Sequence, residues 1–276
     1  MISIAVAMGL LVSSLLVGVP SEVQAGSINI TINDGLSPAV GPATGKGLNR
    51  GGEDQEVEPG NTWNQAWELE GFFYNPATRT LSMVGGFNFK TGFSDGGDTY
   101  LSGHIFIDVD GVPRYGSNAT DNGIYAGGYQ KIKNTYGYDY ALIMNFGKKT
   151  YDVYKITADS LLKGVDLSRN DQANPFQLAK KNGQYTGELV GTGTLLFTKN
   201  LSDAQTGFSG GSHYQVDLEG LSQSINLSDA YFHFTMGCGN DSLMGHYQVV
   251  PIPGSWLLLG SGLVGLWGFR RRFRRG

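Results

Sequence analysis

The chain has 276 residues, enough for one large domain or two small ones, and its 42 glycines, 12% aromatic and 16% charged residues favour a turn-rich all-β protein over a helical one. The net charge is −4; leaving out the five arginines of the tail and Glu22 reduces 20 basic and 24 acidic residues to 15 and 23, so the central body is near −8. An acidic body argues against nucleic acid and anionic lipid as partners. The single cysteine, Cys238, excludes an internal disulfide.

Residues 1–25 have the pattern of a secretory signal peptide. An apolar run from Ile4 to Val19 is followed by Pro20, and Val23-Gln24-Ala25 fits the small-x-small cleavage rule. We therefore expect cleavage between Ala25 and Gly26; the alternative is an uncleaved membrane anchor. No lysine or arginine precedes the apolar run, so we expect the natural start of the protein to lie upstream of Met1.

Residues 26–60 combine one predicted strand with a long polar segment. Ser27–Ile32 alternates polar and apolar residues, as a strand does. The rest is rich in glycine, proline, asparagine and acidic residues, a loop composition. Its acidic cluster could bind a metal, but a solvated loop is the favoured interpretation; the cluster consists of Glu53, Asp54, Glu56 and Glu58.

Residues 61–248 are predicted to form a single antiparallel β domain. Alternating segments predict strands at 67–72, 80–90, 100–109, 123–129, 139–146, 151–156, 184–190, 193–198, 212–218 and 230–236. Turns are expected at 75–78, 95–98 and 145–149, and a short helical segment at Ala158–Leu162 with Thr157 as its cap. About ten short strands with almost no helix predict an antiparallel, jelly-roll-like β-sandwich.

The sequence Asp108-Val109-Asp110-Gly111 resembles the start of a calcium-binding loop. Alternating carboxylates on a turn can direct their oxygens at one hard cation, and Asp95 and Asp98 could lie nearby across a hairpin. The closing bidentate glutamate of an EF-hand is absent, since Asn118 stands in that region. The alternative is a β-turn in which the aspartate caps its own backbone. No other cofactor is expected.

Other candidate chemistry gives weaker signals. Gly207–Gly211 matches the G-x-S-x-G nucleophile pattern around Ser209, but no βαβ alternation surrounds it, so a surface loop is favoured. The histidines at 104, 213, 233 and 246 show no metal-ligand spacing. Cys238 lies in a Gly-Cys-Gly-Asn-Asp turn, where a small buried residue is favoured over a lipidated, cross-linked or redox-active thiol.

Alternate tyrosines suggest a further option. Tyr136, Tyr138 and Tyr140 would point to one face if they lay on a strand. That face would be a sugar-stacking platform if exposed and core if covered, and core packing is favoured.

Residues 249–276 form a tail of three parts. A proline-containing motif, Val249-Val250-Pro251-Ile252-Pro253-Gly254-Ser255, precedes an uncharged apolar run from Trp256 to Phe269. The run ends at Arg270, Arg271, Arg272, Arg274 and Arg275. This pattern predicts a single transmembrane helix with a cytoplasmic basic stop. Its 14 residues rise only about 21 Å, against roughly 30 Å of hydrocarbon, which favours a temporary anchor.

This tail resembles the PEP-CTERM sorting signal of bacterial exosortase substrates. The usual Val-Pro-Glu-Pro of that family corresponds to Val250-Pro251-Ile252-Pro253, with Ile252 at the acidic position. The run from Thr235 to Asp241 is similar to the closing strand of a subgroup of such surface proteins. The resemblance implies export through the secretion translocon and transient anchoring in the inner membrane. Processing by an exosortase-like enzyme near Pro251–Pro253 would then place the protein at the cell surface or outside the cell.

Two classes of function follow from these patterns. The favoured one is a non-enzymatic surface or extracellular-matrix protein, in the exopolysaccharide or biofilm setting that the family resemblance implies. The alternative is a secreted carbohydrate-binding protein or a glycan-active hydrolase on a jelly-roll scaffold. A hydrolase needs a pair of carboxylates in a cleft, and the sequence singles out no such pair.

Overall fold

The computed structural model describes residues 26–32, 64–111, 113, 131–166 and 173–249. In these ranges antiparallel strands dominate, and the helical elements are the 3-10 turn η2 (Gln65–Trp67) and the single-turn helix α1 (Asp203–Thr206). The all-β class predicted from composition is therefore confirmed. Over the same ranges, no helix has the length and apolar character needed to span a membrane. The predicted strand at 123–129 and the acidic cluster at 53–58 lie outside the described residues.

Ten strands form the main sheet. Each pairs antiparallel with its neighbours, and in sheet order they are β1 (Ile28–Asn29), β2 (Leu69–Asn75), β3 (Thr80–Gly85), β15 (His213–Glu219), β14 (Glu188–Leu201), β9 (Thr150–Lys155), β8 (Tyr140–Asn145), β6 (Ile105–Asp108), β16 (Asp229–Thr235) and β17 (Ser242–Gln248).

Three smaller sheets accompany the main one. A three-stranded sheet has the order β11 (Gln177–Leu178), β10 (Leu161–Lys163), β7 (Lys131–Lys133). Two hairpins are formed by β4 (Phe93–Asp95) with β5 (Asp98–Tyr100), and by β12 (Lys180–Lys181) with β13 (Gln184–Tyr185).

The segment around β1 closes the main sheet on itself. Ile28 and Asn29 pair with β2, and the Ile30 amide donates to the Phe72 carbonyl at 3.0 Å. On the other side, the His246 amide donates to the Ile30 carbonyl at 2.7 Å, and Thr31 bridges to Gly245 of β17. A Cβ at Gly245 would lie 3.1 Å from the Phe72 ring, so glycine permits this close approach. Five residues thus cover both edges that the sheet would otherwise expose.

The interior of the closed sheet is one apolar core. Alternate residues point inward, as the period of two requires, so Ile105 and Ile107 enter the core while Phe106 faces outward. Aromatic rings fill much of the space: Phe72 lies 6.1 Å from Phe232, and Phe89 lies 5.6 Å from Phe234. Such ring pairs contribute about 0.5–1.5 kcal/mol beyond the area that they bury.

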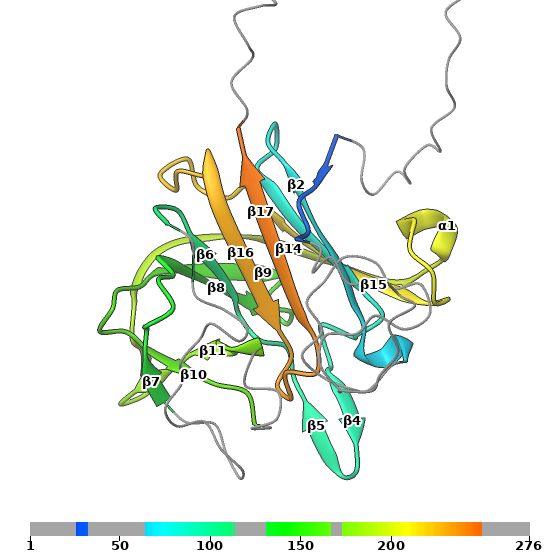
Figure 1. The fold of residues 1–276 in the computed structure, drawn as a ribbon, viewed down its shortest axis with the longest axis horizontal. Coiled ribbons are helices and arrows are strands. Elements are labelled where there is room, and N and C mark those ends of the chain that lie inside the picture. The colour runs from blue at the N-terminus through cyan, green and yellow to red at the C-terminus, as the bar shows by residue number, and fades with distance from the viewer. Residues whose placement is uncertain (1–25, 33–63, 112, 114–130, 167–172, 250–276) are drawn as a thin grey trace, which may run out of the picture.

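Two outer faces of the closed sheet are also covered (Figure 1). The outer face of β2, β3 and β15, called here the α1 side, carries α1 and the loop after it, whose Phe208 ring lies 6.0 Å from Phe73. The outer face of β6, β8 and β16, called the small-sheet side, packs against the three-stranded sheet through a second apolar cluster that includes Phe106, Tyr138 and Leu162.

The three predicted turns are confirmed at the expected positions. The 75–78 turn joins β2 to β3, and the 145–149 turn joins β8 to β9. The 95–98 turn joins β4 to β5, where Gly96 and Gly97 have φ of 61° and 95°, a left-handed conformation that glycine adopts without strain. Short-range turn chemistry was therefore a reliable guide.

Several predicted elements need correction. The helical segment over Ala158–Leu162 is wrong: Ser160 closes a turn with Thr157, and Leu161 begins β10. Pairing of β10 with β7 and β11 decides the conformation there and outweighs local helix propensity. The predicted strands at 184–190 and 193–198 become β13 and one long strand, β14, with an irregularity between Leu189 and Gly191. The sequence reading also missed β17.

Candidate functional site

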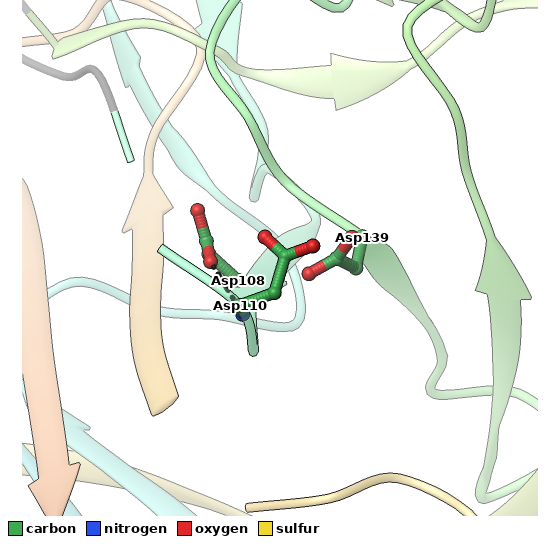
Figure 2. Close-up of side chains that lie close together, drawn as sticks. All are labelled: Asp108, Asp110 and Asp139. Carbon is green, nitrogen blue, oxygen red and sulfur yellow. Dashed lines mark hydrogen bonds between the residues drawn. The ribbon is translucent and has the colours of Figure 1, made fainter. Parts of the chain in front are cut away.

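Three aspartates meet at one edge of the small-sheet side (Figure 2). Asp108 ends β6, Asp110 follows it on the turn, and Asp139 immediately precedes β8. One carboxylate oxygen from each lies within 4.8 Å of the others. Asp108 and Asp110 are the residues predicted as calcium ligands. Asp139 was missed because it is distant in sequence and only the pairing of β6 with β8 brings it here.

Backbone amides already engage part of this cluster. Asp108 Oδ1 accepts hydrogen bonds from the amides of Asp110 at 3.1 Å and Gly111 at 2.8 Å, the local capping that was the alternative to a metal site. Asp139 Oδ2 accepts from the Val109 amide at 2.8 Å. Burial raises the pKa of Asp139, the Val109 hydrogen bond opposes that shift, and the Asp110 and Asp108 charges add to it.

The chemistry of the three carboxylates fits a hard divalent cation. Calcium takes six to eight oxygen ligands, so three carboxylates would supply part of the shell and carbonyls or water the remainder. A cation would also neutralise the repulsion that helps to raise the pKa of Asp139. The predicted neighbours Asp95 and Asp98 belong to the β4–β5 hairpin and are not part of this cluster.

A second polar group, which the sequence did not reveal, lies on the α1 side. His213 is fully buried; its Nδ1 lies 2.7 Å from Glu70 Oε2 and its Nε2 lies 2.9 Å from Asp203 Oδ1. Each ring nitrogen therefore lies within hydrogen-bond distance of a carboxylate oxygen. Gln65 completes the group by donating from Nε2 to Glu70 Oε1 at 2.7 Å. The hydrogen bond from His213 lowers the pKa of Asp203.

The G-x-S-x-G match is a loop beside this group. Gly207 caps the C-terminus of α1 with φ of 85°, and the chain then continues into β15. The order is helix, loop, strand, whereas a nucleophile elbow runs from strand to helix. The histidine nearest in sequence, His213, has a carboxylate oxygen beside each ring nitrogen, so neither nitrogen is directed at Ser209.

The other histidines have separate environments. His104 Nδ1 accepts from the Leu178 amide at 3.0 Å, and burial lowers the pKa of His104 to about 3. His233 Nε2 donates to the Pro175 carbonyl at 2.8 Å, and burial lowers the pKa of His233 to about 4. Both are therefore neutral packing residues, as expected. His246 is partly exposed and pairs with Asp229 at 2.7 Å.

Two further predictions can be compared with the structure. Cys238 is 1% exposed in a turn, and burial raises its pKa to about 12, which makes the thiol unreactive as the favoured interpretation required. The tyrosine prediction is half correct. Tyr136 and Tyr138 are core residues of the small-sheet side, but they precede β8, and Tyr140 packs against the interior core instead. The expected single tyrosine face is therefore wrong.

A polar pocket of about 330 Å³ supplies the carboxylate pair that the hydrolase alternative would need. It is lined by Ser27, Asn75, Thr78, Thr80, Ser82, Asp217 and Glu219. Asp217 and Glu219 are two residues apart on β15, so they share one face. Burial raises the pKa of Asp217, and hydrogen bonds from Ser82 and Gln215 oppose the shift.

The predicted sorting residues lie outside the described residues. These are Ala25, Val250, Pro251, Ile252, Pro253, Gly254 and the arginines Arg270, Arg271, Arg272, Arg274 and Arg275. Gly26, on the other side of the predicted cleavage point, is described as an exposed turn residue with φ of 82° before β1.

Comparisons with known proteins found no match. No protein-family model matches the chain, no curated protein is significantly similar to it, and no solved structure resembles its fold at a significant level.

Proposed function

We propose that the protein is a non-enzymatic exported surface or extracellular-matrix protein, delivered by an N-terminal signal peptide and a C-terminal exosortase sorting tail. The supporting observation is that the closed sheet begins just after the predicted signal peptide and ends just before the predicted sorting tail. Its first strand starts at Ile28, three residues after Ala25, and its last strand ends at Gln248, two residues before Val250. The sheet therefore needs neither predicted tag for its completion.

The direction of the strands adds to this support. Thr31 bridges to Gly245 in antiparallel register, so the start of β1 and the end of β17 lie at the same end of the sheet (Figure 1). The β4–β5 hairpin lies at the opposite end in the same view. A body tethered by its tail would hold this end towards the membrane and present the hairpin end away from it.

The proposal includes the predicted partners and fold detail. The partners are the secretion translocon, the inner membrane as a temporary anchor, an exosortase-like enzyme and extracellular polysaccharide. We also infer that opposite halves of the closed sheet face each other across the single core as the layers of a jelly-roll-like sandwich do. Calcium at the aspartate cluster would stabilise the fold and is not required for any reaction.

Mass spectrometry of the protein recovered from the cell surface tests the sorting proposal. We expect an N-terminus at Gly26 and a C-terminus near Pro251–Pro253. The P251A/P253A variant should accumulate in the inner-membrane fraction, whereas T78A, a change in an exposed turn, should be sorted normally. Surface-exposed protein that retains Arg270–Gly276 would contradict the proposal.

A glycan-active hydrolase is the second candidate function, and the Asp217–Glu219 pocket is the observation that favours it. No aromatic side chain lines this pocket within the described part of the chain, so a sugar-stacking surface is not part of it. Glycan hydrolysis that is lost in both D217N and E219Q, with unchanged folding, would replace the non-enzymatic proposal.

A further inference from the structure

A pocket of about 460 Å³ lies where the three-stranded sheet meets the β12–β13 hairpin. It is lined by Lys163, Gln177, Leu178, Lys180 and Tyr185. Two cross-strand pairs supply most of this lining: Lys163 is directly opposite Gln177, and Lys180 is directly opposite Tyr185. The volume is within the range of about 300–1,000 Å³ that is usual for small-ligand sites.

The hydroxyl of Thr186 connects the β10–β11 strand pair to the β12–β13 hairpin. Thr186 Oγ1 accepts from the Leu161 amide at 2.8 Å and lies 3.1 Å from the Ala179 carbonyl, to which it can donate. Backbone bonds connect the same residues, from the Ala179 amide to the Leu161 carbonyl at 2.7 Å and from the Thr186 amide to the Ala179 carbonyl at 3.0 Å. The walls of the pocket are therefore held in place before any ligand arrives, which lowers the cost of binding.

The side chains that line the pocket are also held in position. Lys180 Nζ lies 4.5 Å from the centroid of the Tyr185 ring, and that ring packs against Tyr154 with centroids 5.1 Å apart. Lys163 Nζ lies 3.5 Å from Gln177 Oε1, and Gln177 Nε2 donates to the Ser102 carbonyl at 3.1 Å. Both lysines thus line one pocket, each from a different strand pair.

The charge of this pocket is opposite to that of the body. Two lysines are among its five lining residues, and none of the five is acidic. Asp152, which is close enough to affect Tyr185, lies on β9 and accepts from the Thr192 hydroxyl at 3.0 Å. Beneath the pocket, the positive charges of Lys163 and Lys180 add to the effect of burial in lowering the pKa of His104. A local positive site in an acidic protein selects for a compact anion.

We propose that this pocket binds a carboxylated sugar, such as one uronate residue of an extracellular polysaccharide. The carboxylate would lie between Lys163 and Lys180, which supply charge-assisted hydrogen bonds. The Gln177 amide and the Tyr185 hydroxyl can exchange hydrogen bonds with sugar hydroxyls. The inference rests on the proposed function in one respect, because only export brings the pocket into contact with extracellular glycans.

Two other anionic partners fit the observations less well. Duplex DNA presents one charge about every 1.7 Å along its axis, a long array of phosphates that a single pocket of about 460 Å³ cannot follow. An anionic membrane surface is broad, whereas the two lysines line a concave site of the size of one or two sugar rings. Both partners enter the experiment as outcomes that would overturn the proposal.

Calorimetric titration of the purified full-length protein tests the proposal. The probes are an oligogalacturonate, the same oligosaccharide with its carboxyl groups reduced to alcohols, inorganic phosphate, a short DNA duplex, and vesicles of anionic phospholipid. We expect oligogalacturonate to bind and the reduced oligosaccharide to bind at least about tenfold more weakly. The K163Q/K180Q variant should lose about tenfold or more in affinity for oligogalacturonate, and Y185F a few-fold.

The matched control is K148Q/K199Q, which removes the same charge from exposed lysines outside the pocket. It should bind oligogalacturonate as the wild type does, and thermal unfolding will confirm that each variant is folded. The proposal is overturned if folded wild type does not bind oligogalacturonate or if both double variants weaken binding equally. It is also overturned if phosphate, DNA, vesicles or the reduced sugar bind as well as the uronate. Because sorting is measured on cell fractions, failure of binding leaves the export result intact, and the reverse also holds.

Discussion

On the α1 side of the closed sheet, His213 lies between the carboxylates of Glu70 and Asp203. On the small-sheet side, His104 and His233 instead form hydrogen bonds with backbone groups of Leu178 and Pro175. The small-sheet side instead gathers like charges, at Asp108, Asp110 and Asp139. A buried imidazole with a carboxylate at each ring nitrogen has its hydrogen bonds satisfied without a ligand. In a cluster of like charges held by backbone amides, an added cation would reduce the repulsion between the carboxylates. The first arrangement therefore fits a structural role, and we propose the second as a cation site.

Removing His213 should have the largest effect on this comparison. We expect H213A to lower the free energy of unfolding by about 3–5 kcal/mol, because Glu70 would stay buried without its histidine partner. Urea denaturation measures the change. The control is H246A, which removes a partly exposed histidine that also pairs with an aspartate, and it should cost far less. If both variants lost the same free energy of unfolding, burial would not make the His213 interactions more important to stability than the exposed pair.

Acid should weaken the small-sheet side through its neutral histidines. Their pKa values, about 3 for His104 and about 4 for His233, lie below the unfolded value of 6.5, so the unfolded chain binds protons first as pH falls. The stability that the neutral forms provide is complete above pH 6.5. It is lost as pH falls towards 4, by up to about 1.4 kcal/mol per pH unit for each histidine. Urea denaturation from pH 7 to pH 4.5 would show this slope.

The H104Q/H233Q variant provides the control for the acid effect. Glutamine keeps an amide that can donate or accept at each position and removes the titration, so the slope between pH 6.5 and 4.5 should flatten. A slope equal to that of the wild type would show that these histidines are not the neutral groups that the structure describes.

Calcium should act on the aspartate cluster alone. By mass action, calcium at one hundred times its dissociation constant would stabilise the fold by about 2.7 kcal/mol, visible as a higher Tm. D139N should abolish the shift, because it removes one of three carboxylates. D95N, in an exposed hairpin turn, should keep it. A Tm that does not respond to calcium or chelator would leave Asp108 as a turn cap only.

The smallest effect is expected at Asp217, a half-buried carboxylate on the α1 side whose hydrogen-bond partners are Ser82 and Gln215. Because burial raises its folded pKa, ionisation above pH 4 costs stability in the folded state. We expect D217N to raise the free energy of unfolding at pH 7 by at most about 1 kcal/mol, measured by urea denaturation. At pH 3, where the wild-type carboxyl is protonated, the gain should disappear. A loss of stability at pH 7 would indicate that Asp217 depends on its negative charge.

Local chemistry made part of the fold predictable. The turns at 75–78, 95–98 and 145–149 depend on neighbouring residues, and the alternation in Ile105–Asp108 shows which side chains face the core. Asp108 and Asp110 could be proposed as a pair because they are two residues apart. The helical segment at 158–162 failed because its conformation depends on strands that lie elsewhere in the sequence.

The sequence by itself determined the all-β class, the turns, the acidic character of the body and the pattern of the two predicted tags. Tertiary structure alone decided which distant groups meet. Strand register decides four such meetings. Residues 28–32 close the sheet, Asp139 joins the aspartate cluster, Glu70 lies against His213, and Lys163 and Lys180 line one pocket. Register is set by packing of the whole core, because a shift of one residue would turn every inward side chain outward.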